Sequence, residues 1–156
     1  MRMNAAQLAF ADEQFDTVSA SASLHHLPNV AQALKEMARI LKPGGTFIFI
    51  EMTRDAQTEA QRTLVQLHHW AADVDTARGV YHRKTFTRQE LVGFLESMEL
   101  QNVVMHDFLK TDCDPMDEAA IRQCEDAIDK VLQRVFGLPE YEPLKTRSQG
   151  LLKRIR

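Results

Sequence analysis

The chain is short of cysteine, of long apolar runs and of signal-like patterns. Cys113 and Cys124 are too few for a disulfide framework, and no further cysteine or suitably spaced histidine completes a zinc site. No apolar run approaches the roughly 18 residues needed to span a bilayer. Residues 1–10 lack the basic and then apolar pattern of a secretory signal. We therefore expect two free thiols, no bound metal, no membrane association and a cytoplasmic location.

An excess of charge of either sign is also missing, since 19 lysines and arginines stand against 22 aspartates and glutamates and the net charge is −3. This balance gives no electrostatic reason to expect a nucleic-acid partner. The 156 residues are 44% hydrophobic and 26% charged, which is typical of a soluble globular domain. Because no repeat, linker or low-complexity stretch divides the chain, we expect a single domain over residues 1–156.

The first part of the chain has the pattern of a strand, a helix and a second strand. Residues 15–23 (FDTVSASAS) are small and apolar to neutral, as in a strand buried on both faces. Asn29 can cap a helix whose apolar residues recur at helical spacing, and residues 42–45 (KPGG) end that helix. Residues 46–51 (TFIFIE) then predict a second buried strand. This order implies a parallel pair with a right-handed crossover, which belongs to the α/β class.

Two further helices are predicted in the middle of the chain. The first covers residues 55–75, and its apolar stripe comprises Ala60, Leu64, Leu67, His68, Ala71 and Val74. The second has the clearest signal in the sequence, because Thr87 and Glu90 form a capping box before residues that run to Met98.

The remainder of the chain continues the alternation of strand and helix. Residues 103–108 predict a strand. Asp114 as a cap and Pro115 in the first turn predict another helix, which ends before Gly137. Residues 144–156 predict a helical tail.

Three motifs in the first 51 residues resemble one enzyme family. Residues 4–16 (NAAQLAFADEQFD) are similar to a loop that opens with Asp-Ala and closes with Phe-Asp. Residues 21–29 (SASLHHLPN) resemble a Ser-x-x-x-His-His-Leu stretch, and residues 41–45 (LKPGG) resemble a helix-to-strand turn. In order and spacing these motifs resemble the class I, Rossmann-like methyltransferases that use S-adenosylmethionine, in the type 11 group with ubiquinone and menaquinone biosynthesis enzymes. The likeness continues more loosely over residues 81–108, where Glu99 stands at a usual glycine position.

This resemblance implies S-adenosylmethionine as the cofactor and S-adenosylhomocysteine as a product. Asn4 and Ala5 would meet the adenine, with Asn4 in place of the usual aspartate; its amide oxygen still accepts a hydrogen bond but lacks the charge. Ala20 and Ser21 would lie beside the methionine part of the cofactor. His25 would lie near the methyl-transfer site, where it either accepts a proton or serves only as a packing and hydrogen-bonding residue.

The resemblance also shows what is missing. The family's Gly-rich turn after its first strand and its acidic ribose ligand would both precede Asn4, and no glycine precedes Gly44. No pattern near the end of the chain predicts the family's final antiparallel strand. We therefore expect a partial Rossmann-like sheet without its first two strands and its last, in an N-terminally incomplete chain. The cofactor side of the domain would comprise residues 4–51.

In such an enzyme residues 55–86 would contribute a substrate cover, and residues 87–156 would form the C-terminal helices and strand. The candidates for lining a small-molecule acceptor pocket in this cover are Trp70, Tyr81 and His82. The adjacent His68 and His69 do not predict a metal site, because consecutive residues on a helix point about 100° apart.

Two functions are compatible with this sequence. The favoured one is methyl transfer to a small molecule, for which an N-terminal segment absent here would supply the Gly-rich turn. In this reaction the protein mainly binds, aligns and excludes water, and carbon, oxygen, nitrogen and sulfur acceptors all remain open. The alternative is a non-catalytic methyltransferase-like binding or assembly module, which the missing ribose contacts would permit. In either case the outer edge of the first strand would be bare, and a homodimer through that edge is expected.

Overall fold

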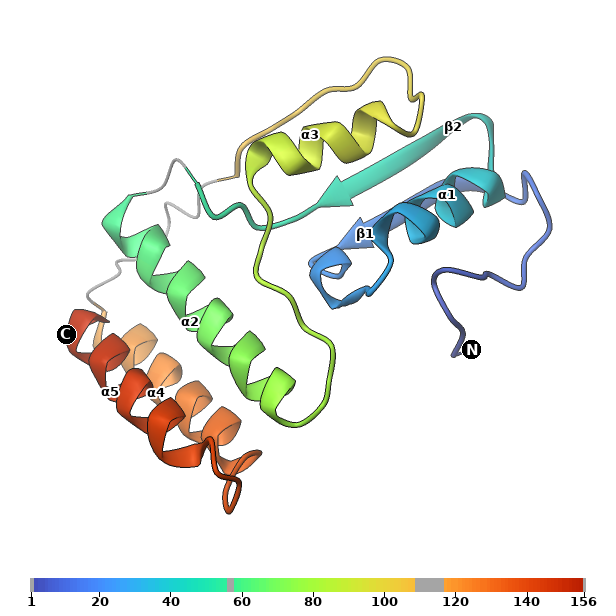
Figure 1. The fold of residues 1–156 in the computed structure, drawn as a ribbon. Coiled ribbons are helices and arrows are strands. Elements are labelled where there is room, and N and C mark those ends of the chain that lie inside the picture. Colours follow the sequence, from blue (N-terminus) through green and yellow to red (C-terminus); the bar gives the residue numbers. More distant parts are fainter. Residues whose placement is uncertain (1, 56–57, 109–116, 156) are drawn as a thin grey trace. The chain divides into compact units, whose positions relative to one another are not determined.

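The computed structural model describes residues 2–55, 58–108 and 117–155 of the chain. It forms two compact units: unit 1 comprises Met1–Asp55 and Thr85–Val103, and unit 2 comprises Ala56–Lys84 and Val104–Arg156. The elements, labelled in Figure 1, are β1 (Phe15–Ser21), the short 3-10 helix η1 (Leu24–His26), α1 (Val30–Ile40), β2 (Leu41–Ile50), α2 (Glu59–Ala77), α3 (Arg88–Glu96), α4 (Glu118–Gln133) and α5 (Tyr141–Ile155). Among the described helices, none combines the length and apolar character that a bilayer crossing requires.

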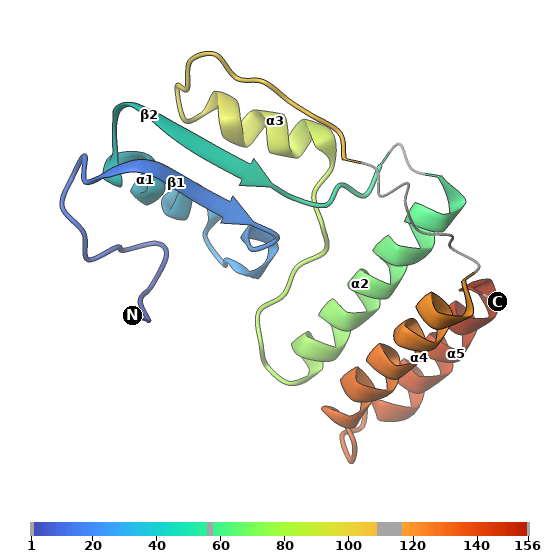
Figure 2. The ribbon, with the colours of Figure 1, turned by 180° about the vertical axis from the view of Figure 1, so that it is seen from behind.

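Unit 1 is built on two parallel strands joined through α1. Figures 1 and 2 show β1 and β2 side by side, and residues 17–21 pair in register with residues 46–50. The strand β2 begins at Leu41, earlier than predicted, because Leu41 already pairs with Phe15 ahead of an irregularity in the register. The parallel pairing confirms the predicted α/β class and the strand, helix, strand order of a partial Rossmann-like sheet.

The irregular first part of β2 requires glycine at Gly45. A Cβ atom on Gly45 would lie 2.9 Å from the carbonyl oxygen of Lys42 and 3.0 Å from that of Asp16. Both neighbours are backbone atoms, so a side chain would push β1 and this part of β2 apart. The ammonium of Lys42 lies 2.7 Å from Oδ1 of Asp16 and lowers the pKa of that carboxyl group by hydrogen bonding and by its charge.

The hydrophobic cluster of unit 1 joins α1 and α3 to the strands. Its buried members are Ala20, Leu24, Val30, Leu34, Phe86 and Leu91. Phe47 and Phe49 of β2 pack against this cluster. Because side chains alternate along a strand, Ile48 and Ile50 point the other way, where they are 44% and 52% exposed. The described part of unit 1 therefore covers one face of β2 and leaves the other to solvent.

Both helix starts predicted in unit 1 are confirmed. The side chain of Asn29 accepts a hydrogen bond from the amide of Gln32 at the start of α1. Thr87 and Glu90 form the reciprocal contacts of a capping box at the start of α3.

The turn after α3 has a left-handed backbone at two non-glycine residues. Glu99 has a φ of +53° and Asn102 a φ of +55°. This conformation costs a residue with a Cβ roughly 1–2 kcal/mol. Glu99 is the position at which the likeness to methyltransferases implies glycine, so the turn keeps a glycine-like geometry with a glutamate in it.

The predicted strand over residues 103–108 is wrong. These residues are described and belong to no strand, and Val104 and Phe108 are 72% and 89% exposed. A strand needs a neighbour for its backbone N–H and C=O groups. The only sheet in the described chain consists of β1 and β2, and neither pairs with this segment.

Unit 2 consists of α2, α4 and α5, which lie against one another in Figures 1 and 2. Their shared hydrophobic cluster contains Trp70, Val74, Ile128, Leu132, Val135 and Leu144. The side chain of Trp70 is buried, and its indole Nε1 donates to the carbonyl oxygen of Leu144 at 2.9 Å. This hydrogen bond fixes α2 to the first turn of α5.

The long helix of unit 2 differs in detail from its prediction. It begins at Glu59, where Thr58 provides a capping box, several residues later than expected. Leu64 was predicted on the buried stripe but is 53% exposed, because the adjacent Val65 points into the structure instead. The helix was therefore predicted correctly, whereas its buried face was partly wrong.

The start of α4 also differs from the prediction. The carboxylate of Asp117 caps this helix by accepting a hydrogen bond from the amide of Ala119 at 2.8 Å. Asp114 and Pro115, the predicted cap and first-turn residues, lie outside the described residues. The predicted helical tail is confirmed as α5, which begins at Tyr141.

Candidate functional site

The side chain of Glu51 holds the loop that follows β1. Its Oε1 accepts hydrogen bonds from the amides of Ser23 at 2.8 Å and Leu24 at 2.7 Å. Its Oε2 lies 3.0 Å from Nδ1 of His25. The Glu51 side chain is 0% exposed and that of His25 is 2% exposed. A buried carboxylate is stable only with hydrogen-bonding partners, and this one has three.

The contact with Glu51 orients the ring of His25. An ionised carboxylate can only accept, so Nδ1 of His25 carries the hydrogen in this contact and Nε2 of a neutral ring carries the electron pair. A carboxylate behind a histidine is the arrangement of an oriented general base. The catalytic role given to His25 stays a prediction, but the structure adds to it the orienting residue Glu51.

Sequence reasoning missed Glu51 and treated it only as the end of a predicted strand. The contact arises because β1 and β2 run parallel, so that the loop after β1 meets the end of β2. A signal was available, since an acidic residue directly after a buried strand lies at the carboxyl edge of the sheet, where ligands bind in α/β folds.

Ala20 and Ser21 lie at this same edge. Ala20 is buried in the cluster of unit 1, and Ser21 is the exposed last residue of β1. After them Ala22 adopts a φ of +43° and its amide donates to the carbonyl oxygen of Ile50 at 2.8 Å. The chain thus turns sharply between Ser21 and the residues that Glu51 holds.

Asn4 and Ala5 form a tight turn ahead of β1. The side-chain oxygen of Asn4 accepts from the amide of Ala6 at 3.0 Å, and its carbonyl oxygen accepts from the amide of Gln7 at 3.0 Å. Asn4 is exposed. The predicted adenine residues therefore lie in an ordered turn, which the next residues connect to α1.

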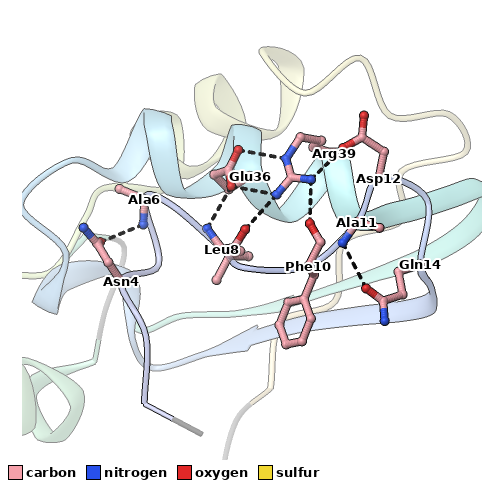
Figure 3. A network of polar contacts seen from close by, with 9 residues as sticks. All are labelled: Asn4, Ala6, Leu8, Phe10, Ala11, Asp12, Gln14, Glu36 and Arg39. Carbon is pink, nitrogen blue, oxygen red and sulfur yellow. Dashed lines mark hydrogen bonds and ion pairs between the residues drawn. The ribbon is translucent and has the colours of Figure 1, made fainter.

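A single arginine of α1 holds this N-terminal segment, as Figure 3 shows. The guanidinium of Arg39 donates to the carbonyl oxygens of Leu8 at 3.0 Å and Phe10 at 2.9 Å. It also pairs with Glu36 at 2.9 Å and with Asp12 at 2.6 Å. The carboxylate of Glu36 in turn accepts from the amide of Leu8 at 2.8 Å.

These contacts shift the pKa values of Glu36 and Arg39. Hydrogen bonds from Arg39 and from the Leu8 amide lower the pKa of Glu36 to about 2. The carboxylates of Glu36 and Asp12 raise the pKa of Arg39 above its ordinary value. Residues 8–12 are therefore fixed to α1 by ionic hydrogen bonds although they form no helix or strand.

The three residues predicted to line an acceptor pocket have different surroundings in unit 2. Trp70 is part of the hydrophobic cluster, and Tyr81 is 45% exposed. The ring of His82 contacts Asp75, with Nδ1 and Oδ2 2.9 Å apart. Their role as a pocket lining stays a prediction.

A cavity of about 430 Å³ lies in unit 2 between α2 and α5. It is lined by Gln66, His69, Lys84, Arg147, Gly150, Leu151 and Arg154. Arg147 pairs with Asp73 at 2.6 Å, and Arg154 donates to the side chain of Gln66 at 2.5 Å. None of the predicted acceptor residues lines this cavity.

Known proteins are similar to the N-terminal part of this chain. The methyltransferase domain family matches residues 1–49, which include β1, α1 and most of β2. A sterol 4-C-methyltransferase of Caenorhabditis elegans is 37% identical over 65 residues, which are 40% of this chain and 20% of that protein. A ubiquinone/menaquinone biosynthesis C-methyltransferase of Nitrobacter hamburgensis is 42% identical over 50 residues, which are 32% of this chain and 20% of that protein. The chain thus spans about a fifth of the length of these relatives.

A solved structure extends the likeness of fold along the chain. It comes from Bacillus halodurans C-125, is described as a candidate methyltransferase, and matches with a TM-score of 0.57 at 20% identity. The match covers 91% of this chain and 57% of the other. The similarity in sequence to methyltransferases therefore lies in residues 1–49, and the solved structure shows a similar fold over most of the chain.

Proposed function

We propose that this protein transfers a methyl group from S-adenosylmethionine to a small-molecule acceptor and that His25 takes up the acceptor's proton. The observation that supports this is the buried pair of His25 and Glu51, 3.0 Å apart, at the carboxyl end of the parallel strands. Open α/β sheets bind their ligands at that end. His25 also lies within the segment that matches the methyltransferase domain.

The residues proposed for the cofactor fit it chemically. The side-chain oxygen of Asn4 has two electron pairs and uses one for Ala6, so it can accept from an adenine amine with the other. The amide of Ala5 would serve an adenine ring nitrogen, and Ala20 and Ser21 would lie beside the methionine part. When bound, S-adenosylmethionine supplies a methyl group activated on a sulfonium.

The pair of Glu51 and His25 would handle the proton. A hydroxyl, amine or acidic carbon that receives a methyl group must lose a proton. With its Nδ1–H directed to Glu51, His25 takes that proton on Nε2, and the buried carboxylate stabilises the imidazolium that results. Two similar proteins are a sterol 4-C-methyltransferase and a demethylmenaquinone methyltransferase of Halalkalibacterium halodurans, and their names suggest a sterol and demethylmenaquinone as the first acceptors to test.

The decisive experiment separates cofactor binding from methyl transfer. Calorimetry with S-adenosylmethionine is expected to give saturable binding for the wild type, His25→Ala, Glu51→Gln and the control His106→Ala, which removes an exposed histidine. Formation of S-adenosylhomocysteine with either acceptor should fall by about 100-fold or more in His25→Ala, by less in Glu51→Gln, and not in the control.

Two outcomes would contradict the proposal. A wild-type chain that binds no S-adenosylmethionine would favour the non-catalytic binding or assembly module. Normal binding with full methyl transfer by His25→Ala would instead remove the role of His25 and leave the rest of the proposal in place.

We also propose a homodimer that pairs through the outer edge of β1. Among the described residues, β1 is hydrogen-bonded to β2 alone, so its other edge can receive a strand. Light scattering should give the molar mass of a dimer, and this mass should not fall to that of the monomer at the concentrations used for the other measurements. A monomer at high concentration would contradict this proposal.

A further inference from the structure

A carboxylate in unit 2 holds the ring of His82 in one orientation. Nδ1 of His82 lies 2.9 Å from Oδ2 of Asp75, and the side chains are only 5% and 15% exposed. The other oxygen of Asp75 faces Arg78 at 3.6 Å and Arg134 at 3.7 Å. The backbone carbonyl of Asp75 also accepts from the amide of Val80 at 2.9 Å. The group that orients His82 is therefore fixed on several sides.

A second imidazole faces the opposite nitrogen of His82. Nε2 of His68, on α2, lies 3.3 Å from Nε2 of His82, and the ring centroids are 5.0 Å apart. Rings aligned head to head along the line between these nitrogens would have centroids separated by the nitrogen distance plus a full ring width. The observed separation is shorter, so at least one ring is tilted away from that line.

The hydrogen positions allow both nitrogens to act as electron-pair donors. The carboxylate of Asp75 accepts the Nδ1 hydrogen of His82, which leaves the electron pair of a neutral ring on Nε2. With the electron pair of His82 on Nε2, a hydrogen bond across the 3.3 Å between the two Nε2 atoms requires the hydrogen to lie on Nε2 of His68. When that hydrogen moves to Nδ1 of His68, each Nε2 carries an electron pair, and the two atoms lie 3.3 Å apart. Neutral imidazole is a preferred ligand of late first-row metal ions.

We propose that His68 and His82 bind a late first-row divalent metal ion, with Zn²⁺ as the probe, and that Asp75 is the positioning residue behind His82. A tetrahedral zinc ion with Zn–N bonds of about 2.0–2.1 Å places two ligand nitrogens about 3.3–3.4 Å apart. The observed Nε2 separation is 3.3 Å. A carboxylate on the far nitrogen is the contact that selects the tautomer of metal-binding histidines. This site uses residues of unit 2 alone and does not depend on the proposed methyl transfer.

Calorimetric titration of the full chain with Zn²⁺ tests the proposal. Two protein ligands leave the remaining positions to water, so we expect saturable binding in the micromolar range. His68→Ala and His82→Ala should each weaken binding by about 10-fold or more, and Asp75→Asn should weaken it by about 10- to 100-fold. The control His106→Ala should bind as the wild type does. An absence of saturable binding below a millimolar concentration, or unchanged affinity in both alanine variants, would overturn the site.

A second measurement on the wild-type chain covers the case in which the variants fail to fold. A long-range ¹H–¹⁵N spectrum reports the tautomer of each histidine ring. Zn²⁺ should shift the Nε2 resonances of His68 and His82 and move the hydrogen of His68 to Nδ1, while His106 stays unchanged. If neither ring responds, the contact is only a hydrogen bond between two histidines and the proposal is wrong.

Discussion

Unit 1 and unit 2 hold their residues in place by different means. Unit 1 depends on directional contacts, among them the carboxylate of Glu51, the guanidinium of Arg39 and the close backbone approach at Gly45. Unit 2 depends on apolar packing between helices around Trp70. The family match falls in unit 1. Many sequences satisfy apolar packing, whereas few satisfy a fixed set of backbone contacts, so the constrained unit is the one that sequence comparison recognises.

The largest test of this contrast is Gly45→Ala in unit 1. The new Cβ atom would meet the carbonyl oxygens of Lys42 and Asp16, and we expect the free energy of unfolding to fall by about 3 kcal/mol. Gly93→Ala in α3 is the matched control, because its Cβ would meet open space. This change should raise the free energy of unfolding by about 0.5–1 kcal/mol. Urea unfolding measures both. A stable Gly45→Ala variant would show that this part of β2 yields and that unit 1 is less constrained than its geometry implies.

Trp70→Phe tests the packing of unit 2. It removes the hydrogen bond to the Leu144 carbonyl group and part of the buried ring, and should lower the free energy of unfolding by about 2 kcal/mol. Leu64→Ala, on an exposed position of the same helix, should change it by less than about 0.5 kcal/mol. Circular dichroism is the suitable measurement, since Trp70 is the chain's single tryptophan. Equal effects of the two changes would mean that α2 does not pack as described.

Glu99→Gly should stabilise unit 1. Glycine removes the strain of a φ of +53°, and we expect a gain of about 1 kcal/mol in the free energy of unfolding. Glu96→Gly, at the last residue of α3, should instead lower the free energy of unfolding by about 0.5–1 kcal/mol. A loss at both positions in chemical unfolding would indicate that the turn after α3 is not left-handed.

The pair of Glu36 and Arg39 should give the smallest effect, visible in the pH dependence of unfolding. Because the pKa of Glu36 falls from 4.5 to about 2 on folding, its contribution is complete above about pH 4.5 and is lost as the pH falls toward 2. The Tm of Glu36→Gln should therefore fall less than the Tm of the wild type as the pH is lowered over this range. Glu118→Gln, which affects only an exposed pair with Arg122, should leave the fall unchanged. Identical acid profiles for all three proteins would contradict the expected linkage.

Features that depend on neighbouring residues could be predicted from the sequence. Asn29 and Thr87 cap their helices through contacts three residues away, and α1 ends at Ile40, shortly before the KPGG segment that was predicted to end it. The parallel strand pair followed from the order of these local signals. The cap of α4 shows the limit of such reasoning, because a nearby aspartate, Asp117, takes the position.

Features that join distant residues could not be predicted in the same way. Glu51 and His25 lie 26 positions apart and meet only because the strands are parallel. The segment over residues 103–108 has the composition of a strand, but among the described residues no strand pairs with it. His68 was considered with its neighbours on the helix, whereas its contact is His82, 14 positions away and beyond the end of α2.

The contacts of Arg39 also set the motion of the segment before β1. The amide and the carbonyl group of Leu8 are both bonded to the pair of Glu36 and Arg39, although Leu8 lies in no helix or strand. Exchange of the Leu8 amide hydrogen with solvent therefore requires its hydrogen bond to the Glu36 carboxylate to break. The segment that follows the turn at Asn4 and Ala5 is thus held by a contact on α1 that acid weakens, because protonation of Glu36 removes its charge.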